Sequence, residues 1–303
     1  MLARPDARWF TPTLEPAELE ARAPSLALRF LGTAGFTVCW AGRTLVLDPF
    51  VSRPGVLRTL FTRLRPDVDA IRRHVPEADD VLVGHAHHDH VLDAPDLCRL
   101  TGARLVGSRD VAQVAQAAGL PAAQMHVVTA GDTIACGPVT VRALRSRHGR
   151  VYGRVPLPGS ISTPPRWPAR LRRFRHGEVL SWHLEGPGAS VLHVDSSDYV
   201  DEALEGLRAD VLCACAIGWT WRPRYVEGLI ERLRPRYVVP CHWDSFFGPV
   251  ERRARLLPFC RLGGFLDAVR AHGATPVLLE PLAWWAPTAS PSPLPGREAR
   301  GGV

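Results

Sequence analysis

The stretch that decides the fold is VLVGHAHHDHVLDAP, residues 81–95. Its apolar start predicts a buried strand over 79–84, and it continues into His85-x-His87-x-Asp89-His90. His85 and His87 are two positions apart, so on extended chain their side chains point to the same side. Asp89 and His90 follow at the turn into a helix that we expect to reach about residue 100. Imidazole and carboxylate donors packed this densely after a strand indicate a site for divalent cations.

Three further donors stand where other predicted strands end, and a metal site needs ligands from such positions. His148 follows the run VTVRALRS, Asp195 closes SVLHVDSS and His242 closes RYVVPCHW. The sequence leaves alternatives open: His126 could replace His148, and Asp198 could replace Asp195. His88 is interpreted as a residue outside the ligand set, either behind a ligand or exposed, and His193 as a residue of the core.

These residues resemble the metallo-β-lactamase superfamily of metal-dependent hydrolases. The resemblance covers about residues 26–282 and includes LGTAGFTV (31–38) and LVLDP (45–49). It implies an α/β fold, a four-layer αβ/βα sandwich of two mixed β-sheets flanked by helices. The recurring strand–helix–strand units of the sequence point the same way. Carried over to this chain, the resemblance implies a first metal held by His85, His87 and His148, a second held by Asp89, His90 and His242, Asp195 bridging both, and Asp48 orienting a ligand histidine.

The resemblance also implies the chemistry. Two divalent cations, most often zinc with manganese or iron as alternatives, would share a hydroxide that cleaves an ester, lactone or phosphodiester bond. Asp89 and His90 would lie at the catalytic centre, where Asp89 could orient the hydroxide. Many β-lactamases of the superfamily carry Arg where His90 stands and lack a bridging carboxylate such as Asp195. The pattern therefore favours the thioesterase, lactonase and phosphodiesterase branches, and loosely the ascorbate-6-phosphate-lactonase-like and N-acyl-phosphatidylethanolamine phospholipase D-like proteins.

Composition narrows the class of protein. The chain has 303 residues, 46% of them hydrophobic and 22% charged, which argues against a disordered protein. No apolar run is long enough to span a bilayer, and the first ten residues lack the apolar core of a secretory signal. The seven cysteines form no Cys-x-x-Cys and mostly lie in apolar runs, which predicts buried thiols in a cytoplasmic protein. Cys241 could bind a soft metal, but strand alternation should turn it away from His242.

The net charge of +7 comes entirely from arginine. Arg147, Arg150 and Arg154 flank His148 and could bind an anionic substrate, either a small molecule or a lipid-like one. A nuclease of the same superfamily is an alternative suggested by the basic charge. It is not favoured, because the sequence contains no aromatic-interleaved RNA-binding module and no extra nuclease domain.

We expect an N-terminal arm over 1–25, a hydrolase domain over 26–285 and a disordered tail over 286–303. Within the domain, the Arg- and Pro-rich segment 149–180 is interpreted as an insertion or lid.

A helix is predicted over 53–65. Both 53–65 and 166–176 combine arginine with apolar residues, so they could dock on anionic lipid, and a lipid phosphodiesterase is a further alternative. An ordinary surface helix at 53–65 and a basic lid at 166–176 would explain the same pattern. The sequence does not determine the oligomeric state. The apolar face of the predicted helix would consist of Val56, Leu57, Leu60, Phe61 and Leu64.

Overall fold

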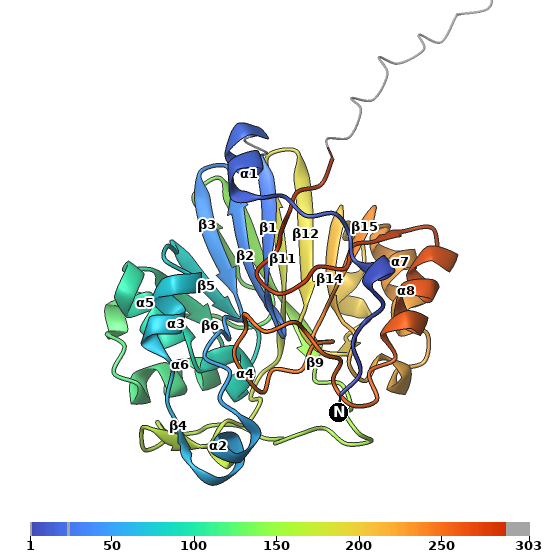
Figure 1. The fold of residues 1–303 in the computed structure, drawn as a ribbon. Helices are drawn as coiled ribbons and strands as arrows, with labels where there is room; N and C mark the ends of the chain where they lie inside the picture. Colours follow the sequence, from blue (N-terminus) through green and yellow to red (C-terminus); the bar gives the residue numbers. More distant parts are fainter. Residues whose placement is uncertain (1, 23–24, 289–303) are drawn as a thin grey trace, which may run out of the picture.

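Two mixed β-sheets pack face to face in the computed structural model, which describes residues 2–22 and 25–288 (Figure 1). The first sheet has the strand order β17-β1-β2-β3-β5-β6-β7. Its strands are β1 (Leu26–Gly32), β2 (Gly35–Trp40), β3 (Arg43–Leu47), β5 (Asp80–Val83), β6 (Arg104–Gly107), β7 (Met125–Val127) and β17 (Trp284–Trp285).

The second sheet has the order β13-β9-β11-β12-β14-β15-β16, with β8 paired to β9. Its central strands β12, β14 and β15 are parallel, while β9 and β11 run antiparallel to their neighbours. The strands are β8 (Thr133–Cys136), β9 (Val139–Arg147), β11 (Leu180–Gly186), β12 (Ala189–Val194), β13 (Asp198–Tyr199), β14 (Val211–Cys215), β15 (Tyr237–Cys241) and β16 (Thr275–Pro276).

Helices cover the outer face of each sheet, which gives the four layers expected from the sequence and confirms the fold class. Figure 1 shows α3, α5 and α6 outside the first sheet and α7 and α8 outside the second. None of the helices in the described part of the chain is both long and apolar enough to cross a bilayer. The helices are α1 (Pro16–Arg22), α2 (Val56–Phe61), α3 (Val68–His74), α4 (His88–Val91), α5 (Ala94–Thr101), α6 (Arg109–Ala117), α7 (Tyr225–Leu233) and α8 (Leu262–Ala271).

Strand alternation divides the core between two layers. Along β5, Leu82 joins the cluster between the two sheets, whereas Val81 and Val83 join the cluster beneath α3, α5 and α6. In β3, Leu45 and Leu47 face the other sheet in the same way, opposite the helices. Because both faces are buried, these parallel strands read as continuous apolar runs in the sequence. The stretch 81–95 therefore begins in the core of the molecule.

The parallel arrangement also places the polar residues that follow the strands. In an open sheet, the carboxyl ends of parallel strands meet at one edge, where ligands bind. Asp48 follows β3 and His85 follows β5 in the first sheet; Asp195 follows β12 and His242 follows β15 in the second. The fold thus brings strand ends from both sheets to a common edge.

The predicted helix over 53–65 is wrong before residue 56 and beyond residue 61. Helix α2 ends at Phe61, and Leu64 lies in β4 (Arg63–Leu64), which pairs with β10 (Ala169–Arg170) of the segment 149–180. Of the five residues of the predicted apolar face, the four that lie on α2 are exposed, and only Leu64 is buried. Pairing with a distant strand ended the helix, and local periodicity does not reveal such a pairing.

The segment 149–180 is anchored to the domain as well as paired to β4. The backbone N–H groups of Ile161 and Glu178 donate to the two carboxylate oxygens of Asp110 in α6, at 2.5 and 3.2 Å. Near the N-terminus, Phe10 and Leu14 bridge to Leu278 and Trp284, so this arm lies along the domain. Of the expected tail, residues 289–303 lie outside the described residues.

A buried ion pair connects three separate segments near the shared sheet edge. Arg53 Nη2 lies 2.7 Å from Asp244 Oδ2, and both side chains are almost fully buried. The backbone N–H of Thr33 donates to the other oxygen of Asp244 at 2.8 Å. The Thr33 carbonyl in turn accepts from the backbone N–H of His242 at 2.5 Å. The pair therefore fixes the loop that carries His242.

Replacing Asp244→Ala should lower the free energy of unfolding by about 3–5 kcal/mol, because it leaves the Arg53 guanidinium buried without its counter-charge. Urea denaturation followed by circular dichroism measures this loss. The matched control is Asp267→Ala, which breaks the exposed pair between Asp267 and Arg270 on α8. That variant should lose less than about 1 kcal/mol. Equal unfolding midpoints for Asp244→Ala and the control would contradict the role given to the buried pair.

Candidate metal centre

The site begins at Gly84, where the quoted stretch leaves β5. Its N–H donates to Asp48 Oδ1 at 2.7 Å, and its carbonyl accepts from the N–H of Leu180 at 2.9 Å. A Cβ atom at this position would lie 2.2 Å from Asp195 Oδ2 and 3.0 Å from the Leu180 carbonyl oxygen. Only glycine therefore lets the first sheet approach a carboxylate of the second sheet so closely.

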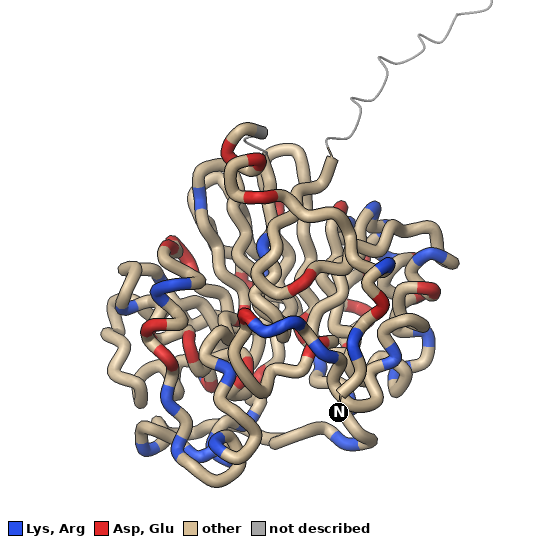
Figure 2. The backbone as a smooth tube through the Cα atoms, viewed as in Figure 1, with Lys and Arg blue, Asp and Glu red and all other residues tan. Residues whose placement is uncertain are grey.

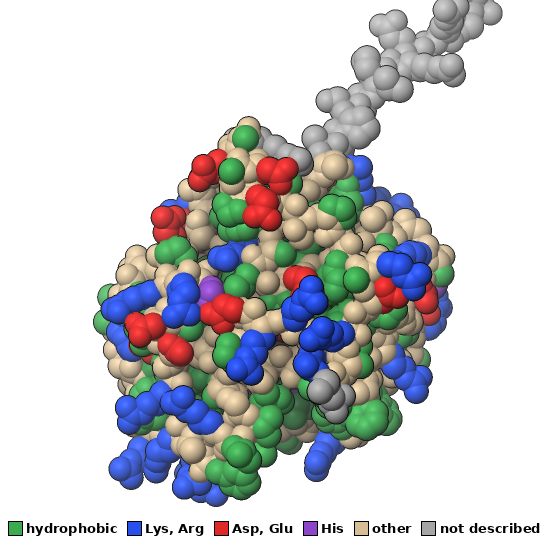
Figure 3. Space-filling view, in the orientation of Figure 1, with side chains coloured by type: hydrophobic (Ala, Val, Ile, Leu, Met, Phe, Trp, Pro, Cys, Tyr) green, Lys and Arg blue, Asp and Glu red, His purple; other side chains and the backbone are tan. Residues whose placement is uncertain are grey.

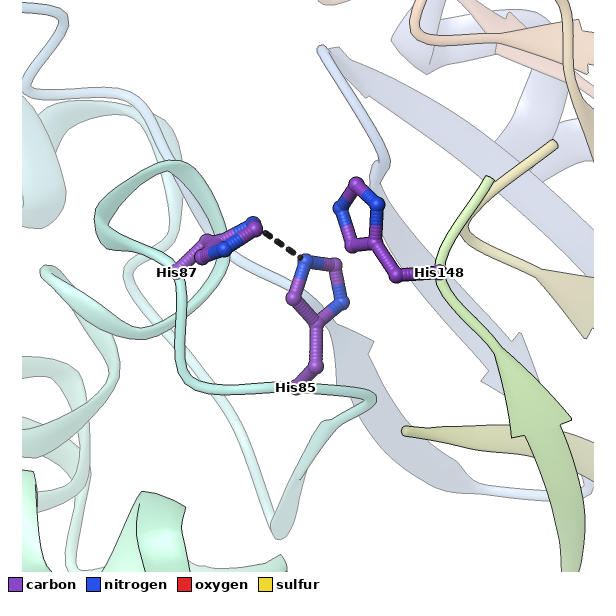
Figure 4. Close-up of side chains that lie close together, drawn as sticks. All are labelled: His85, His87 and His148. Carbon is purple, nitrogen blue, oxygen red and sulfur yellow. Dashed lines mark hydrogen bonds between the residues drawn. The ribbon is translucent and has the colours of Figure 1, made fainter. Parts of the chain in front are cut away.

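Three groups of donor atoms lie together beyond this glycine. Within each group the donor atoms are all within 4.8 Å of one another. Figure 4 shows the imidazoles of the first group, in which His85 and His87 come from one loop and His148 follows β9. All seven ligands expected from the sequence are thereby brought together. The groups are His85, His87 and His148; His85, His90 and Asp195; and Asp89, His90 and His242.

Hydrogen bonds orient the imidazoles. Asp48 Oδ2 lies 2.9 Å from His90 Nδ1, which leaves Nε2 of that ring free to bind a cation. His148 Nδ1 lies 2.8 Å from the Gly149 carbonyl oxygen, which leaves its Nε2 free in the same way. His85 Nδ1 is 2.6 Å from Asp195 Oδ2, and its Nε2 is 3.0 Å from His87 Nδ1. Asp48 thus has the contact that the resemblance implied.

Burial sets the charge of the site. It lowers the pKa of His85, His87 and His90 well below the usual range of imidazole, and the neighbouring imidazoles add to this effect. Burial also lowers the pKa of His148. For Asp89, burial alone would raise the pKa, but nearby imidazoles lower it well below its usual range. Neutral imidazoles and an ionised carboxylate are the forms that bind metal ions.

Several buried donor atoms of the site have no hydrogen-bond partner, which also fits a site for divalent cations. Among the described residues, His87 Nε2, Asp195 Oδ1 and His242 Nδ1 are buried atoms without a hydrogen-bond partner. Buried polar atoms normally have partners, because leaving them unpaired costs about 1–3 kcal/mol each. Atoms of this kind next to several imidazoles are what a metal site requires.

The alternatives left open by the sequence lie elsewhere. His126 is exposed on β7, and Asp198 forms an ion pair with Arg222. Cys241 is a fully buried thiol, and His193 Nε2 lies 2.9 Å from the Ala34 carbonyl oxygen in the core. His88 is buried rather than exposed.

The arginines expected to bind substrate are not brought into the donor groups. Arg147, Arg150 and Arg154 are all exposed, and Arg147 lies on β9 opposite Asp198 of β13. Among the described residues, none of the three forms an ion pair with a carboxylate. Their side chains are free of carboxylate partners in the described part of the chain and can bind an anion.

Sequence reasoning missed His176, at the end of the segment 149–180. Its ring stacks on His148 with centroids 5.7 Å apart, and its centroid is 5.9 Å from that of His87. Its carbonyl accepts from the N–H of Ala86 at 3.0 Å, which ties the segment to the loop that carries His85 and His87. No spacing in the sequence signals this contact, because it depends on the path of a long irregular segment.

Comparison with known proteins identifies the class. A family model described as a beta-lactamase superfamily domain matches residues 27–242, and the chain belongs to that family. It is a metal-dependent hydrolase of the metallo-β-lactamase superfamily. A UPF0173 metal-dependent hydrolase of Anaeromyxobacter dehalogenans is 27% identical over 257 residues, which cover 79% of this chain and 84% of that protein. Its counterpart in Thermococcus onnurineus is 27% identical over 227 residues, covering 72% and 85%.

Solved structures agree on the fold. Igni18, a metallo hydrolase from the archaeon Ignicoccus hospitalis, has a TM-score of 0.54 at 17% identity and covers 87% of this chain and 99% of its own. An isothiocyanate hydrolase from Delia radicum gut bacteria has a TM-score of 0.57 at 13% identity, with coverage of 86% and 98%. At these identities the likeness concerns the fold alone.

Replacing Gly84→Ala should weaken metal binding roughly 10- to 100-fold, the effect typical of disturbing the partners of a ligand. The new methyl group would displace Asp195 from His85, and the overpacking should also cost about 1–3 kcal/mol of stability. Metal analysis after dialysis against a graded chelator series measures the affinity.

The matched control is Gly55→Ala, because a Cβ atom at Gly55 would meet nothing within 4 Å. That variant should retain the metal affinity of the wild type. Wild-type affinity in Gly84→Ala as well would show that the close approach of the two sheets does not matter for binding.

Proposed function

We propose that this chain is a dinuclear metallohydrolase that cleaves an ester, lactone or phosphodiester bond of an anionic substrate. The observation that carries the proposal is the overlap of the three donor groups. His85 belongs to the first two groups and His90 to the last two, so the groups form one continuous set. A set of seven donors joined in this way is more than one tetrahedral ion requires and suits two adjacent ions.

The donors favour zinc. Imidazole nitrogen and carboxylate oxygen suit zinc and also manganese and iron, and the described cluster contains no thiolate that would select a softer metal. The first ion would be held by His85, His87 and His148. The second would be held by Asp89, His90 and His242, with Asp195 between the two.

Bound cations would supply an acidified water molecule as nucleophile and would polarise the bond to be cleaved. The protein's own groups do the rest. Asp48 holds the His90 ring in one orientation through Nδ1. Asp89 has one oxygen 3.2 Å from His242 Nε2, and its ionised carboxylate can orient a water molecule or accept its proton. We assign Asp89 and His90 to the catalytic centre on this basis.

The substrate is proposed to be a small or lipid-like anion. Arg147, Arg150 and Arg154 are exposed near His148 along the chain, and their guanidinium groups can bind a phosphate or carboxylate in bidentate fashion. We also propose a cytoplasmic protein, because all seven cysteines are free thiols and most of them are buried.

Separate removal of the two proposed cation positions tests the mechanism. His87→Ala should remove mainly the first ion and His242→Ala mainly the second, so each variant should bind about one equivalent of metal fewer than the wild type. Each should also lower kcat/KM about 10³-fold or more toward whichever p-nitrophenyl phosphodiester, lactone or thioester the wild type hydrolyses. Elemental analysis and steady-state kinetics give the two readouts.

The control is His126→Ala, an exposed histidine on β7 outside the site, which should change neither quantity. A wild-type protein that binds a single equivalent of metal, or a His87→Ala protein that keeps full metal content and activity, would refute the dinuclear proposal.

A further inference from the structure

Helix α2 turns its apolar side chains outward. The exposed fractions of Val56, Leu57, Leu60 and Phe61 are 45, 73, 54 and 69%, and Thr59 is the one buried residue of this helix. A surface helix of a globular domain normally buries its apolar side and exposes its polar side. A contiguous exposed apolar patch of this kind marks a place where another surface binds.

A cluster of arginines lies directly beside this helix. Strand β4 follows α2 and pairs with β10, so Arg63 and Arg170 come to lie opposite each other. A hollow of about 150 Å³ there is lined entirely by arginines: Arg63, Arg166, Arg170, Arg172 and Arg173. Among the described residues, no carboxylate forms an ion pair with any of these five.

A second hollow extends the same surface. It measures about 410 Å³, shares Arg166 and Arg173 with the first, and adds Arg175 and the hydroxyl groups of Ser160, Ser162 and Thr163. Guanidinium and hydroxyl groups are the donors that bind phosphate oxygens.

The arginines of this surface have no acidic residue within their own segments of the chain. The sequence contains no Asp or Glu over 49–66 or over 133–177, the two stretches that form it. Figure 2 shows the basic segments around α2 and β4 at the bottom of the view, without acidic segments among them. Figure 3 shows hydrophobic atoms at the bottom of the molecule next to this group of basic side chains. Some arginines elsewhere, such as Arg43 and Arg222, are paired with carboxylates.

We infer that α2 and the neighbouring arginines form a surface that docks on an anionic phospholipid membrane. The apolar side chains of α2 would enter the boundary between headgroups and acyl chains while the arginines contact lipid phosphates. A helix of six residues buries too little apolar surface to bind lipid strongly alone, so the arginines are required. The exposed apolar side chains favour lipid over nucleic acid, because backbone phosphates need the arginines but not Val56, Leu57 or Leu60.

The same segment reaches the candidate metal centre from its inner side. Phe174 is buried, and its ring lies 6.3 Å from that of His88. His176 stacks on His148. The segment that carries the arginine cluster therefore also forms part of the wall of the site, so a docked membrane would lie next to the site. Binding to lipid does not require catalytic turnover, so vesicle binding and substrate hydrolysis can be measured independently.

Vesicle co-sedimentation of the full metal-loaded protein tests the surface. We expect binding to vesicles of equimolar phosphatidylcholine and phosphatidylglycerol at low salt, and no binding to phosphatidylcholine alone. High salt should release the protein, because screening shortens the reach of the arginines to a few ångströms. The double variants L57Q/F61Q and R172Q/R173Q should each reduce the bound fraction about tenfold or more.

Matched controls replace residues of the same types away from this surface. Val127→Gln changes an exposed apolar residue of β7, and Arg208→Gln changes an exposed arginine that precedes β14 at its amino end. Both should bind vesicles as the wild type does. Circular dichroism and metal content, unchanged in all four variants, would show that they fold.

Three outcomes would overturn the inference: no vesicle binding at low salt, equal binding to neutral vesicles, or wild-type binding in the two double variants. A single-stranded RNA or inorganic phosphate that binds this surface while vesicles do not would assign it to those ligands instead. Failure here would leave the metal content and the hydrolysis assays untouched.

Discussion

The structure depends on one constraint, which is the packing of five imidazoles, three of them buried and two partly buried, and several buried carboxylates within a few ångströms of one another. Buried imidazoles and carboxylates lose their hydrogen bonds to water, which costs free energy. Partners that bind their lone pairs offset this cost. Cations provide those partners, and the depressed pKa values of His85, His87 and His90 keep the rings neutral for them. Two sheets must therefore present their strand ends at the same edge, and the architecture achieves this.

Features far from the donors follow from that constraint. Gly84 lets Asp195 approach because any side chain there would fill the space of its carboxylate. The Arg53–Asp244 pair, together with Thr33, fixes the loop that carries His242. Asp48, Thr33 and His242 all have φ values between 41 and 56°, in the left-handed region that non-glycine residues seldom adopt. At these three positions the surrounding hydrogen bonds hold the strained backbone in place.

The sequence predicted the fold class and brought the seven donors into one hypothesis, because both depend on short patterns. An apolar strand followed by His85-x-His87-x-Asp89-His90 is a short motif that carries the resemblance to the metallo-β-lactamase superfamily, and that resemblance implied the remaining ligands. The course of 149–180 could not be predicted, because it depends on the pairing of β4 with β10 across about a hundred residues. The same pairing takes over where the expected helix over 53–65 ends. His176 is held beside His148 by a different contact, the hydrogen bond from the Ala86 N–H to the His176 carbonyl.

The path of the segment 149–180 also determines where much of the protein's basic charge lies. The segment 149–180 has an inner side with His176 and Phe174 and an outer side with the arginines of the two hollows. A loose lid would gain nothing from so much uncompensated charge, because like charges side by side repel and leave the closed state less stable. Here the segment is held by Asp110 and by β4, so the repulsion is built into the folded state. The repulsion among these arginines lowers the stability of the free protein, and binding to an anionic partner would offset it. The exposed apolar side of α2 indicates that this partner also has an apolar region, as a membrane does.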